Sequence, residues 1–531
     1  MGYFRHGLAF APNHLKAHRP SYVRFASKLK HVDQTSPQLN TPLPFAGLGL
    51  SRAVGLGLES AFPAVAKATD AQATYIPAII QGKKDVMIRG HTGSGKSFGL
   101  ILALLSKCWN PLPDSRRSLP TSLLLVPHRD LAYQYMYWIG RIATATNNPS
   151  HSTPAQVIVR GQENLSSQVS RLRENPPGIL IGTPQAILDV LQEDEHAIDL
   201  TDLGTVVVDE VDYIIDFISA DASRDKKQRL AAKMRRHPSV GKLLLDLIYS
   251  PRARPDRSAS VNNSPQLVVC SATLQTGLRQ LLYRSGWLRN GAYSVVKVRS
   301  EIRAGEARES EKKVAAADFT LDAEVVQHCA LVFSEDGSVN DVEGAVEPKW
   351  SLEEGAHGEE VQTSTHQGGD LLKIPVQPTE EYRVNSSAFE PVLMEGIAAV
   401  FATAVPKVAL LVLPASAPVQ RAVYELRALG INAFGMDLQN TEAYRGGMEE
   451  NPTLVVATTA TVRGIDLPDL SHVFIWGVVD ANSYLHASGR VGRFGRKGRV
   501  VSVLEEKREQ GGRYCRMLKS IGLIPTKFYR L

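Results

Sequence analysis

The sequence predicts an α/β protein with two tandem domains, each built on a mostly parallel sheet flanked by helices. Two series of short, continuously apolar runs carry this prediction, because strands buried on both faces belong to parallel sheets covered by helices. The first series is SLLLV (122–126), GILIG (178–182), TVVVD (205–209) and QLVVC (266–270). The second is VALLVL (408–413), TLVVAT (453–458), HVFIWG (472–477) and RVVSVL (499–504). Helix-compatible segments separate the runs, as tandem α/β domains require.

Composition excludes several classes of protein. The chain has 531 residues, of which 43% are hydrophobic and 21% charged, enough for about two to four domains with full cores. The best candidate for a membrane span, 399–419, contains Lys407 and three prolines, so no membrane partner is expected. The four cysteines are far apart and form no CxxC pair, which argues against a zinc site or a disulfide framework.

The first 32 residues contain six bases and no acid, so they account for the whole net charge of +6. This pattern predicts a mitochondrial transit peptide over 1–32, with RFAS (24–27) as a processing site and the mitochondrial matrix as the location. A disordered basic tail is the alternative. Residues 33–44, which contain prolines, are expected to form a linker into a first domain over 45–310.

Three other segments are biased in charge. Residues 311–388 are expected to form a linker with an acidic insertion of low order, since nine acids and one base lie between 335 and 360. The second domain would then be 389–531. Residues 224–236, with seven bases and one acid, predict either an RNA-facing patch or a solvated helix face. Residues 480–531, with twelve bases and four acids, predict an RNA surface, a docking site for a ribonucleoprotein partner or a solvated tail.

The stretch GHTGSGKS has the spacing of a P-loop. The β-prone run DVMIR (85–89) precedes it and the apolar run FGLILALL follows it, which is the strand, loop and helix order that phosphate binding needs. Backbone N–H groups would surround the phosphates, the lysine would bridge the outer ones, and the last serine would ligate Mg²⁺. The predicted nucleotide-binding residues are Gly90, His91, Thr92, Gly93, Ser94, Gly95, Lys96 and Ser97.

Acidic residues follow one of the predicted strands. DEVD (209–212) comes directly after TVVV, at the carboxyl end of a strand, where open α/β sheets bind ligands. Asp209 could hold Mg²⁺ through water, and Glu210 could orient and deprotonate the water that attacks a phosphate. The pair predicts a hydrolysis site.

Two arginines in the second half could complete that site. HASGRVGR (486–493) places Arg490 and Arg493 three residues apart, on one face if the segment is helical. Guanidinium groups so placed can stabilise the charge that develops as a γ-phosphate leaves, so both are predicted to act as arginine fingers. A basic, glycine-rich loop is the alternative.

With these motifs in order, the chain resembles a superfamily 2 helicase of the DEAD-box or DExD-box type over about 45–530. ATDAQ (68–72) resembles the adenine-reading motif, GHTGSGKS motif I, and DEVD motif II. SAT (271–273) resembles motif III, LLVLPAS (410–416) motif IV, VATTATVRGIDLPDL (456–470) motif V, and HASGRVGR motif VI. VPHRDLAYQ (126–134) and GTPQ (182–185) resemble the PTRELA and TPGR motifs.

The resemblance implies two RecA-like domains, ATP and Mg²⁺ as cofactors, and RNA as the partner. Gln72 would read the adenine, Phe45 would stack on it, and Asp466 would lie near the ribose. Ser271 and Thr273 would couple ATP hydrolysis to strand separation. The residues expected along the RNA, contacting mainly sugar and phosphate, are Arg129, Gly161, Thr183 and Thr458.

Four positions depart from the family pattern. His128 stands for the threonine of PTRELA, Gln185 for the arginine of TPGR, Ala487 for the first arginine of motif VI, and Val211 for the alanine of motif II. The ATP site is therefore closer to the pattern than the RNA-contacting residues are.

The leading hypothesis is an ATP-dependent RNA helicase, a monomer, that separates RNA strands locally or remodels ribonucleoproteins in mitochondria. By analogy with organellar helicases, mitochondrial ribosome assembly or RNA processing is the expected pathway, with mitochondrial ribosomal partners. A second hypothesis is a low-turnover, ATP-dependent RNA clamp or assembly scaffold. A third is a DNA-directed motor, which SAT at 271–273 and Gln72 disfavour.

Overall fold

The protein is described here from a computed structural model. The structure describes residues 44–90, 92–109, 121–146, 154–161, 163–200, 203–220, 222–249, 264–289, 294–299, 325–350, 389–438, 452–467, 469–492, 496–506 and 510–528. The expected transit peptide, its RFAS site, nearly all of the expected linker at 33–44 and the segment 351–388 lie outside these residues. So do His91 and Arg493.

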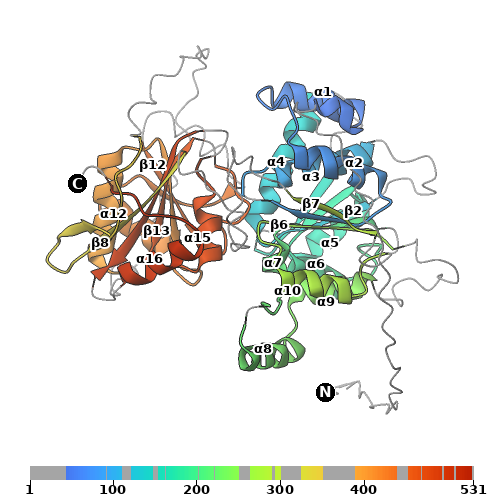
Figure 1. Cartoon of the computed structure of the whole chain (residues 1–531). Helices are drawn as coiled ribbons and strands as arrows, with labels where there is room; N and C mark the ends of the chain where they lie inside the picture. Colours follow the sequence, from blue (N-terminus) through green and yellow to red (C-terminus); the bar gives the residue numbers. More distant parts are fainter. Residues whose placement is uncertain are drawn as a thin grey trace, which may run out of the picture. The chain divides into compact units, whose positions relative to one another are not determined.

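The first sheet has seven strands in the order β3-β4-β2-β5-β6-β1-β7, and every neighbouring pair is parallel (Figure 1). The strands are β1 (Val86–Arg89), β2 (Thr121–Leu125), β3 (Ala155–Ile158), β4 (Ile179–Gly182), β5 (Leu203–Val208), β6 (Gln266–Ser271) and β7 (Val296–Arg299). Both faces are buried, because Val207 of β5 packs into one hydrophobic cluster and its neighbours Val206 and Val208 into another. The predicted parallel α/β fold is confirmed.

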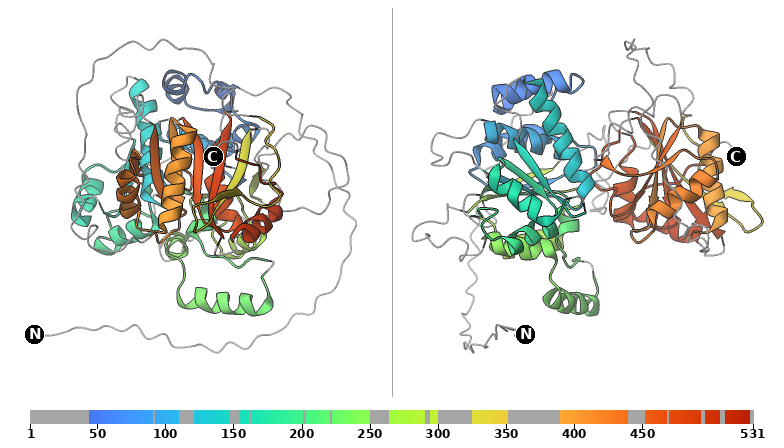
Figure 2. Two further views of the ribbon diagram at one scale, coloured as in Figure 1. Left: turned by 90° about the vertical axis from the view of Figure 1, so that its left-hand side faces the viewer. Right: turned by 180° about the vertical axis from the view of Figure 1, so that it is seen from behind.

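Helices surround this sheet, and one of them, α8, stands away from the others (Figures 1 and 2). They are η1 (Phe45–Leu48), α1 (Arg52–Ala61), α2 (Asp70–Gln81), α3 (Lys96–Trp109), α4 (Arg129–Ala145), α5 (Leu165–Glu174), α6 (Pro184–Glu193), α7 (Val211–Ile214), α8 (Arg224–Arg236), α9 (Val240–Tyr249) and α10 (Thr276–Arg284). Several begin at a side-chain cap; Ser51, Thr69 and Asn164 each accept a hydrogen bond from a backbone N–H of the first turn.

The second sheet also has seven strands, in the order β11-β12-β10-β13-β14-β8-β9. Its pairs are parallel except β8 with β9, which is antiparallel. The strands are β8 (Val326–Phe333), β9 (Val339–Asp341), β10 (Val408–Leu413), β11 (Ala433–Gly435), β12 (Thr453–Thr458), β13 (Leu470–Trp476) and β14 (Gly498–Glu505). The helices are α12 (Pro391–Ala404), α13 (Val419–Ala428), α15 (Ala481–Ser488) and α16 (Gln510–Ser520).

The expected start of the second domain at residue 389 is wrong. Strand β8 lies inside the second sheet, between β14 and β9, although it falls within the segment expected to be a linker. The expected low order of 335–360 is also wrong for its first part, since β9 pairs with β8 and Val342 is buried. Strand β8 was missed because buried polar residues, Gln327 and His328, interrupt its apolar run.

Among the described residues, no helix is both long enough and apolar enough to cross a membrane.

Candidate active site

The loop between β1 and α3 has the backbone conformation that a phosphate cradle needs. Gly93 and Gly95 have φ values of 83° and 75°, which are accessible to glycine at low cost. Lys96, the first residue of α3, is buried and its Nζ donates to the carbonyl oxygen of Gly90 at 2.6 Å. The ammonium group is thus held over the loop that would surround a phosphate.

Asp209 is held at the end of β5 by donors from several elements. Its Oδ2 accepts from Ser97 Oγ at 2.9 Å and from Tyr135 OH at 2.5 Å. Its Oδ1 accepts from the Glu210 N–H at 2.9 Å and from the Cys270 thiol. The structure therefore brings together the two predicted Mg²⁺ ligands, Ser97 and Asp209. A hydroxyl and a carboxylate are oxygen ligands of the kind Mg²⁺ prefers, so the pair fits this ion.

Glu210 has a strained backbone and an unsatisfied carboxylate. Its φ of 50° is unusual for a residue with a side chain, and outliers of this kind cluster at functional sites. The side chain is 4% exposed, and Oε2 has no hydrogen-bond partner among the described residues. Burial raises the pKa of Glu210, with the charge of Asp209 acting in the same direction and that of His486 opposing it. A carboxylate that is buried and more basic than usual is suited to accept a proton.

A second acidic residue, Asp212, joins motifs II, III, V and VI. Its Oδ2 accepts from Thr273 Oγ1 at 2.7 Å and lies 3.9 Å from His486 Nε2 and 3.9 Å from Arg463 Nη1. Burial would raise the pKa of Asp212, but His486, Thr273 and Arg463 together bring it well below its ordinary range. Ser271 Oγ accepts from the Thr273 N–H at 3.0 Å, so the predicted coupling residues are in contact. Their coupling role stays a prediction.

These side chains border a cavity of about 580 Å³. Nine predicted residues line it: Gln72, Thr92, Gly93, Gly95, Lys96, Ser97, Glu210, Asp466 and Arg490. The remaining lining residues are Phe62, Ala64, Val65, Ala66, Lys67, Thr69, Phe98, Trp138 and Gly464. The first domain contributes most of the wall, and the second contributes Gly464, Asp466 and Arg490.

Gln72 connects the start of α2 to the P-loop. Its Oε1 accepts from the Thr69 N–H at 2.9 Å, the Thr69 hydroxyl accepts from the Gln72 N–H, and Gln72 Nε2 donates to Gly95 O at 3.0 Å. The first two bonds form a capping box. The amide is therefore fixed in the wall of the cavity, and its contact with adenine stays a prediction.

The structure places Phe62, and not Phe45, in the wall of the cavity. Phe45 lies in η1, is 5% exposed and packs in the core beside Leu48. Phe62, just after α1, lines the cavity and packs edge-on against Phe98 at 5.1 Å between ring centroids. Trp138 of α4 packs against Phe98 in the same way at 5.5 Å. An aromatic residue ten positions before Gln72 was the signal that sequence reasoning passed over.

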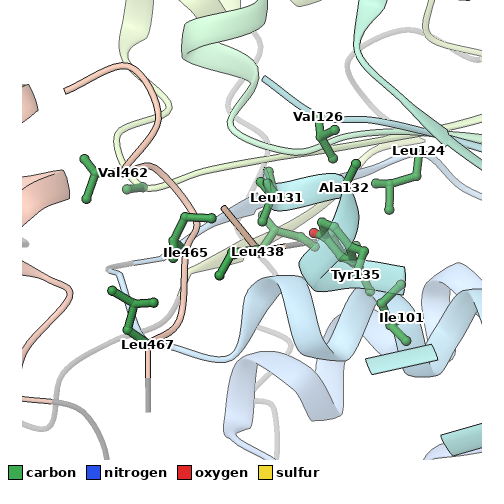
Figure 3. Packing of buried hydrophobic residues seen from close by; sticks show 14 of the residues in the cluster. Ile101, Leu124, Val126, Leu131, Ala132, Tyr135, Leu438, Val462, Ile465 and Leu467 are labelled. Carbon is green, nitrogen blue, oxygen red and sulfur yellow. The ribbon is translucent and has the colours of Figure 1, made fainter. Parts of the chain in front are cut away.

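Helix α4 makes hydrogen bonds to the loop after β12. Gln134 Oε1 accepts from the Asp466 N–H at 2.6 Å, and Gln134 Nε2 donates to Gly464 O at 3.2 Å. Figure 3 shows Leu131 and Tyr135 of the same helix together with the buried Ile465 and Leu438. Sequence reasoning assigned no role to Gln134 or Tyr135.

The four predicted RNA-contacting residues follow the carboxyl ends of strands. Arg129 comes after β2, Gly161 after β3 and Thr183 after β4, which are neighbours in the first sheet and so share one edge. Arg129 and Gly161 are exposed, and Gly161 has a φ of 94°. Thr458 ends β12 in the second sheet and is buried, with its hydroxyl 3.2 Å from that of Thr461. We call Arg129, Gly161 and Thr183 the RNA track. Their contact with RNA stays a prediction.

Comparison with known proteins identifies the family. The model for DEAD/DEAH box helicases matches residues 69–281, and the model for the helicase conserved C-terminal domain matches residues 437–495. The chain belongs to the DEAD/DEAH box helicase family. The chain is 25% identical over 521 residues to the ATP-dependent RNA helicase MAK5 of Debaryomyces hansenii, covering 94% of this chain and 56% of that relative. It is 23% identical over 505 residues to the ATP-dependent RNA helicase DBP7 of Yarrowia lipolytica, covering 92% and 55%.

The chain thus spans about half the length of these curated relatives. Among solved structures, its fold resembles Mss116 bound to ssRNA and UDP-BeF, with a TM-score of 0.60, 16% identity and coverage of 92% of this chain and 79% of that one. It also resembles S. cerevisiae Dbp5 bound to RNA and ADP BeF3, with a TM-score of 0.56, 16% identity and coverage of 91% and 95%. Both likenesses show the two-domain RecA-like fold that the sequence predicted.

The structure shows what the residues that depart from the family pattern contact. His128 caps α4, because its Nδ1 accepts from the Leu131 N–H at 3.3 Å, and its Nε2 lies 2.8 Å from the carbonyl oxygen of Arg463. Burial lowers the pKa of His128 to about 4, so the ring is neutral and Nε2–H donates to that carbonyl. Threonine could form the cap but could not reach Arg463.

The structure describes motif VI only as far as Gly492. Arg490 lines the cavity, and its guanidinium donates to His486 O and, at 2.6 Å, to Ile465 O. Arg493 lies outside the described residues, so its predicted role is untested. Ala487, at the position of the expected arginine, is fully buried in α15.

Proposed function

We propose that this chain is an ATP-dependent RNA helicase that separates RNA strands locally or remodels ribonucleoproteins. The observation that carries the proposal is the cavity where Lys96 and Glu210 of the first domain meet Asp466 and Arg490 of the second. Arg129, Gly161 and Thr183, which follow β2, β3 and β4 of the sheet that also contains the P-loop strand β1, support RNA as the second ligand. The names of the curated relatives, which include an ATP-dependent rRNA helicase, SPB4 of Candida albicans, support the same class.

ATP would be bound with its base between Gln72 and the aromatic wall formed by Phe62, and with its phosphates on the loop from Gly93 to Ser97. Lys96 would neutralise the outer phosphates. Ser97 and Asp209 would hold Mg²⁺, which would neutralise phosphate charge when bound. Each of these residues already has its hydrogen-bond partners, so the site is preorganised.

Hydrolysis would depend on Glu210 and Arg490. The Glu210 carboxylate would orient a water molecule for attack on the γ-phosphate and accept its proton. The Arg490 guanidinium, contributed by the second domain, would stabilise the negative charge that develops as the phosphate leaves. Since both domains are needed, ATP would favour the state in which they are together, by as much as it binds that state better.

RNA would be gripped through phosphates and 2′-hydroxyls by Arg129, Gly161 and Thr183, without reading of sequence. A strand bent along this track could not stay paired, so closure of the two domains would separate a short duplex. Release of phosphate would reopen the protein and free the strand.

We place this activity in the mitochondrial matrix, in ribosome assembly or RNA processing, with the protein acting as a monomer on ribonucleoprotein partners. Support for the location is the acid-free composition of residues 1–32, with six bases. Fusion of residues 1–40 to a fluorescent protein tests it; diffuse fluorescence outside mitochondria would contradict it.

A low-turnover RNA clamp is the second candidate, because Gln185 and Ala487 replace two arginines of the family pattern that would contact RNA or phosphate. Gln185 Nε2 donates to Asp189 Oδ1 at 2.9 Å, and Asp189 also accepts from Arg160. At position 487 an alanine replaces the expected arginine. Both features would weaken the link between RNA binding and turnover.

Steady-state ATP hydrolysis with single-stranded RNA, with single-stranded DNA and without nucleic acid tests the proposal. RNA should stimulate turnover and DNA should not. Glu210→Gln should retain ATP binding and lose hydrolysis by at least ~10²-fold, whereas Lys96→Ala should lose ATP affinity. Retained ATP and RNA binding without turnover would favour the clamp. Wild-type hydrolysis by Glu210→Gln would show that the assigned base is wrong.

A further inference from the structure

Helix α8 displays four exposed bases in a single line. Lys226, Arg229, Lys233 and Arg236 follow one another at spacings of three, four and three residues, which places them on one face of the helix. At a rise of about 1.5 Å per residue, the line is roughly 15 Å long. The partly covered Leu230 borders this line, four residues after Lys226 and three before Lys233, and Met234 lies farther round the helix. We call these four bases the α8 stripe.

By itself, the α8 stripe lowers the stability of the helix. Like charges three and four residues apart repel each other, and Lys226 lies in the first turn, where the helix dipole disfavours a positive charge. Asp225 is the only acid of α8, and no member of the stripe forms an ion pair with another described residue. The helix contains no buried residue that would compensate through packing. A bound polyanion would remove this repulsion.

The chain that leads into α8 begins next to motif II and packs on α10. The segment that leads into α8 begins just after α7, which follows Asp209 and Glu210. A Cβ added at Gly277 would lie 1.9 Å from Ile218 O, so this segment is packed tightly on the start of α10, directly after Ser271–Thr273. Figures 1 and 2 show α8 standing away from α9 and α10, which belong to the same domain.

The same edge of the first sheet carries the RNA track. Arg129 follows β2 and Thr183 follows β4, and β5, which leads to α7, pairs with β2. The carboxyl ends of parallel strands share one edge, so the α8 stripe is tethered to the edge from which the track projects.

We infer that the α8 stripe binds the phosphate backbone of the RNA substrate, beyond the contacts made by the track. This inference rests on the proposed function. Lysine and arginine side chains on a solvated face bind phosphates without sequence preference and release counterions. Helix α8 has no aromatic residue, and its only large apolar side chains are Leu230 and Met234, unlike the core of a protein interface. RNA is therefore favoured over an acidic protein as the partner.

The salt dependence of RNA binding tests the inference. Fluorescence anisotropy of a labelled single-stranded RNA is measured with the full chain and a non-hydrolysable ATP analogue at several KCl concentrations. Each lost phosphate contact lowers the magnitude of the negative slope of log K against log salt by about 0.7. Lys226→Gln/Arg229→Gln/Lys233→Gln/Arg236→Gln should lower it by up to about 2.8, and Arg229→Gln/Lys233→Gln by up to about 1.4. Glutamine keeps a high helix propensity, so α8 should persist.

Lys83→Gln/Lys84→Gln is the matched control for the double variant. Both lysines are exposed and precede β1, at the amino ends of the strands, so the slope should not change. Basal ATP hydrolysis should be the same in all variants. A slope equal to that of the wild type in the quadruple variant would overturn the role of α8, and would leave an acidic protein as the remaining partner. Absence of RNA binding by the wild type itself would instead overturn the proposed function.

Discussion

Tyr135 and Asp209 are joined by a hydrogen bond of 2.5 Å, in which a buried phenol of α4 donates to the carboxylate at the end of β5. The same carboxylate oxygen accepts from Ser97 of the P-loop helix. Through this bond, α4 positions a carboxylate whose function lies in another motif. Helix α4 also carries Gln134, which accepts from the Asp466 N–H. One helix therefore contacts both the carboxylate predicted to bind Mg²⁺ and the loop predicted to lie near the ribose.

Tyr135→Phe should slow ATP hydrolysis with little effect on ATP binding. A hydrogen bond to a charged group is worth about 1.5–3 kcal/mol, which corresponds to a roughly tenfold or larger loss of kcat if the carboxylate moves. Stopped-flow nucleotide binding and steady-state kcat separate the two effects. Tyr133→Phe, on the same helix, is the matched control and should keep the wild-type kcat. An unchanged kcat in Tyr135→Phe would show that Asp209 needs no support from α4.

Phe62→Ala should weaken ATP binding roughly tenfold. Phe62 lines the cavity, and stacking of a base on an aromatic side chain is worth about 1–3 kcal/mol. Titration with a fluorescent ATP analogue measures the change. Phe45→Leu is the informative control, because Phe45 is buried in the core away from the cavity and its replacement should alter stability more than affinity. The opposite ranking of the two variants would restore Phe45 as the stacking residue.

His128→Thr should weaken the ATP-dependent binding of RNA by about 2–10-fold. Threonine keeps the cap of α4 but loses the bond from Nε2–H to Arg463 O, and a neutral hydrogen bond is worth about 0.5–1.5 kcal/mol. RNA affinity with and without an ATP analogue is the measurement. The loss should be confined to the experiment with nucleotide, and an equal loss in both conditions would contradict a role in joining the domains.

His328→Gln should make the protein less sensitive to acid. Burial lowers the pKa of His328 from 6.5 to about 4, so the unfolded state binds the proton first as the pH falls. The wild type therefore loses stability between pH 6.5 and about 4, by up to about 3 kcal/mol for this residue. Glutamine does not titrate. The difference between the two urea midpoints, variant minus wild type, should therefore rise as the pH falls over this window.

Strands with uninterrupted apolar runs were predictable, and those with polar residues in buried positions were not. The run VALLVL coincides with β10, and TLVVAT coincides with β12. Strand β8 contains Gln327 and His328, which local pattern cannot distinguish from surface residues. Their burial depends on partners distant in sequence, since Gln327 bonds to Arg499 and His328 to Tyr484.

The site was predictable where the motif itself defines the geometry, as in the P-loop. The site was not predictable where a residue reaches it from a helix that is distant in sequence from the motif it contacts. Nothing near Tyr135 in the sequence indicates that its hydroxyl reaches Asp209, and the only sign of Phe62 in the sequence is its distance of ten residues from Gln72. For His128, the sequence marked a departure from the pattern, but only the structure assigns the departure a partner.

The position of β8 has a practical consequence for dissecting the protein. A fragment beginning at residue 389 would omit both β8 and β9. The backbone of β14, whose Val500, Val501 and Val503 are fully buried, would then form a new edge of the sheet. Such a fragment should aggregate. The chain is better divided between residues 300 and 325, and foreign sequence is better inserted within 351–388, a stretch enclosed on both sides by pieces of one and the same domain.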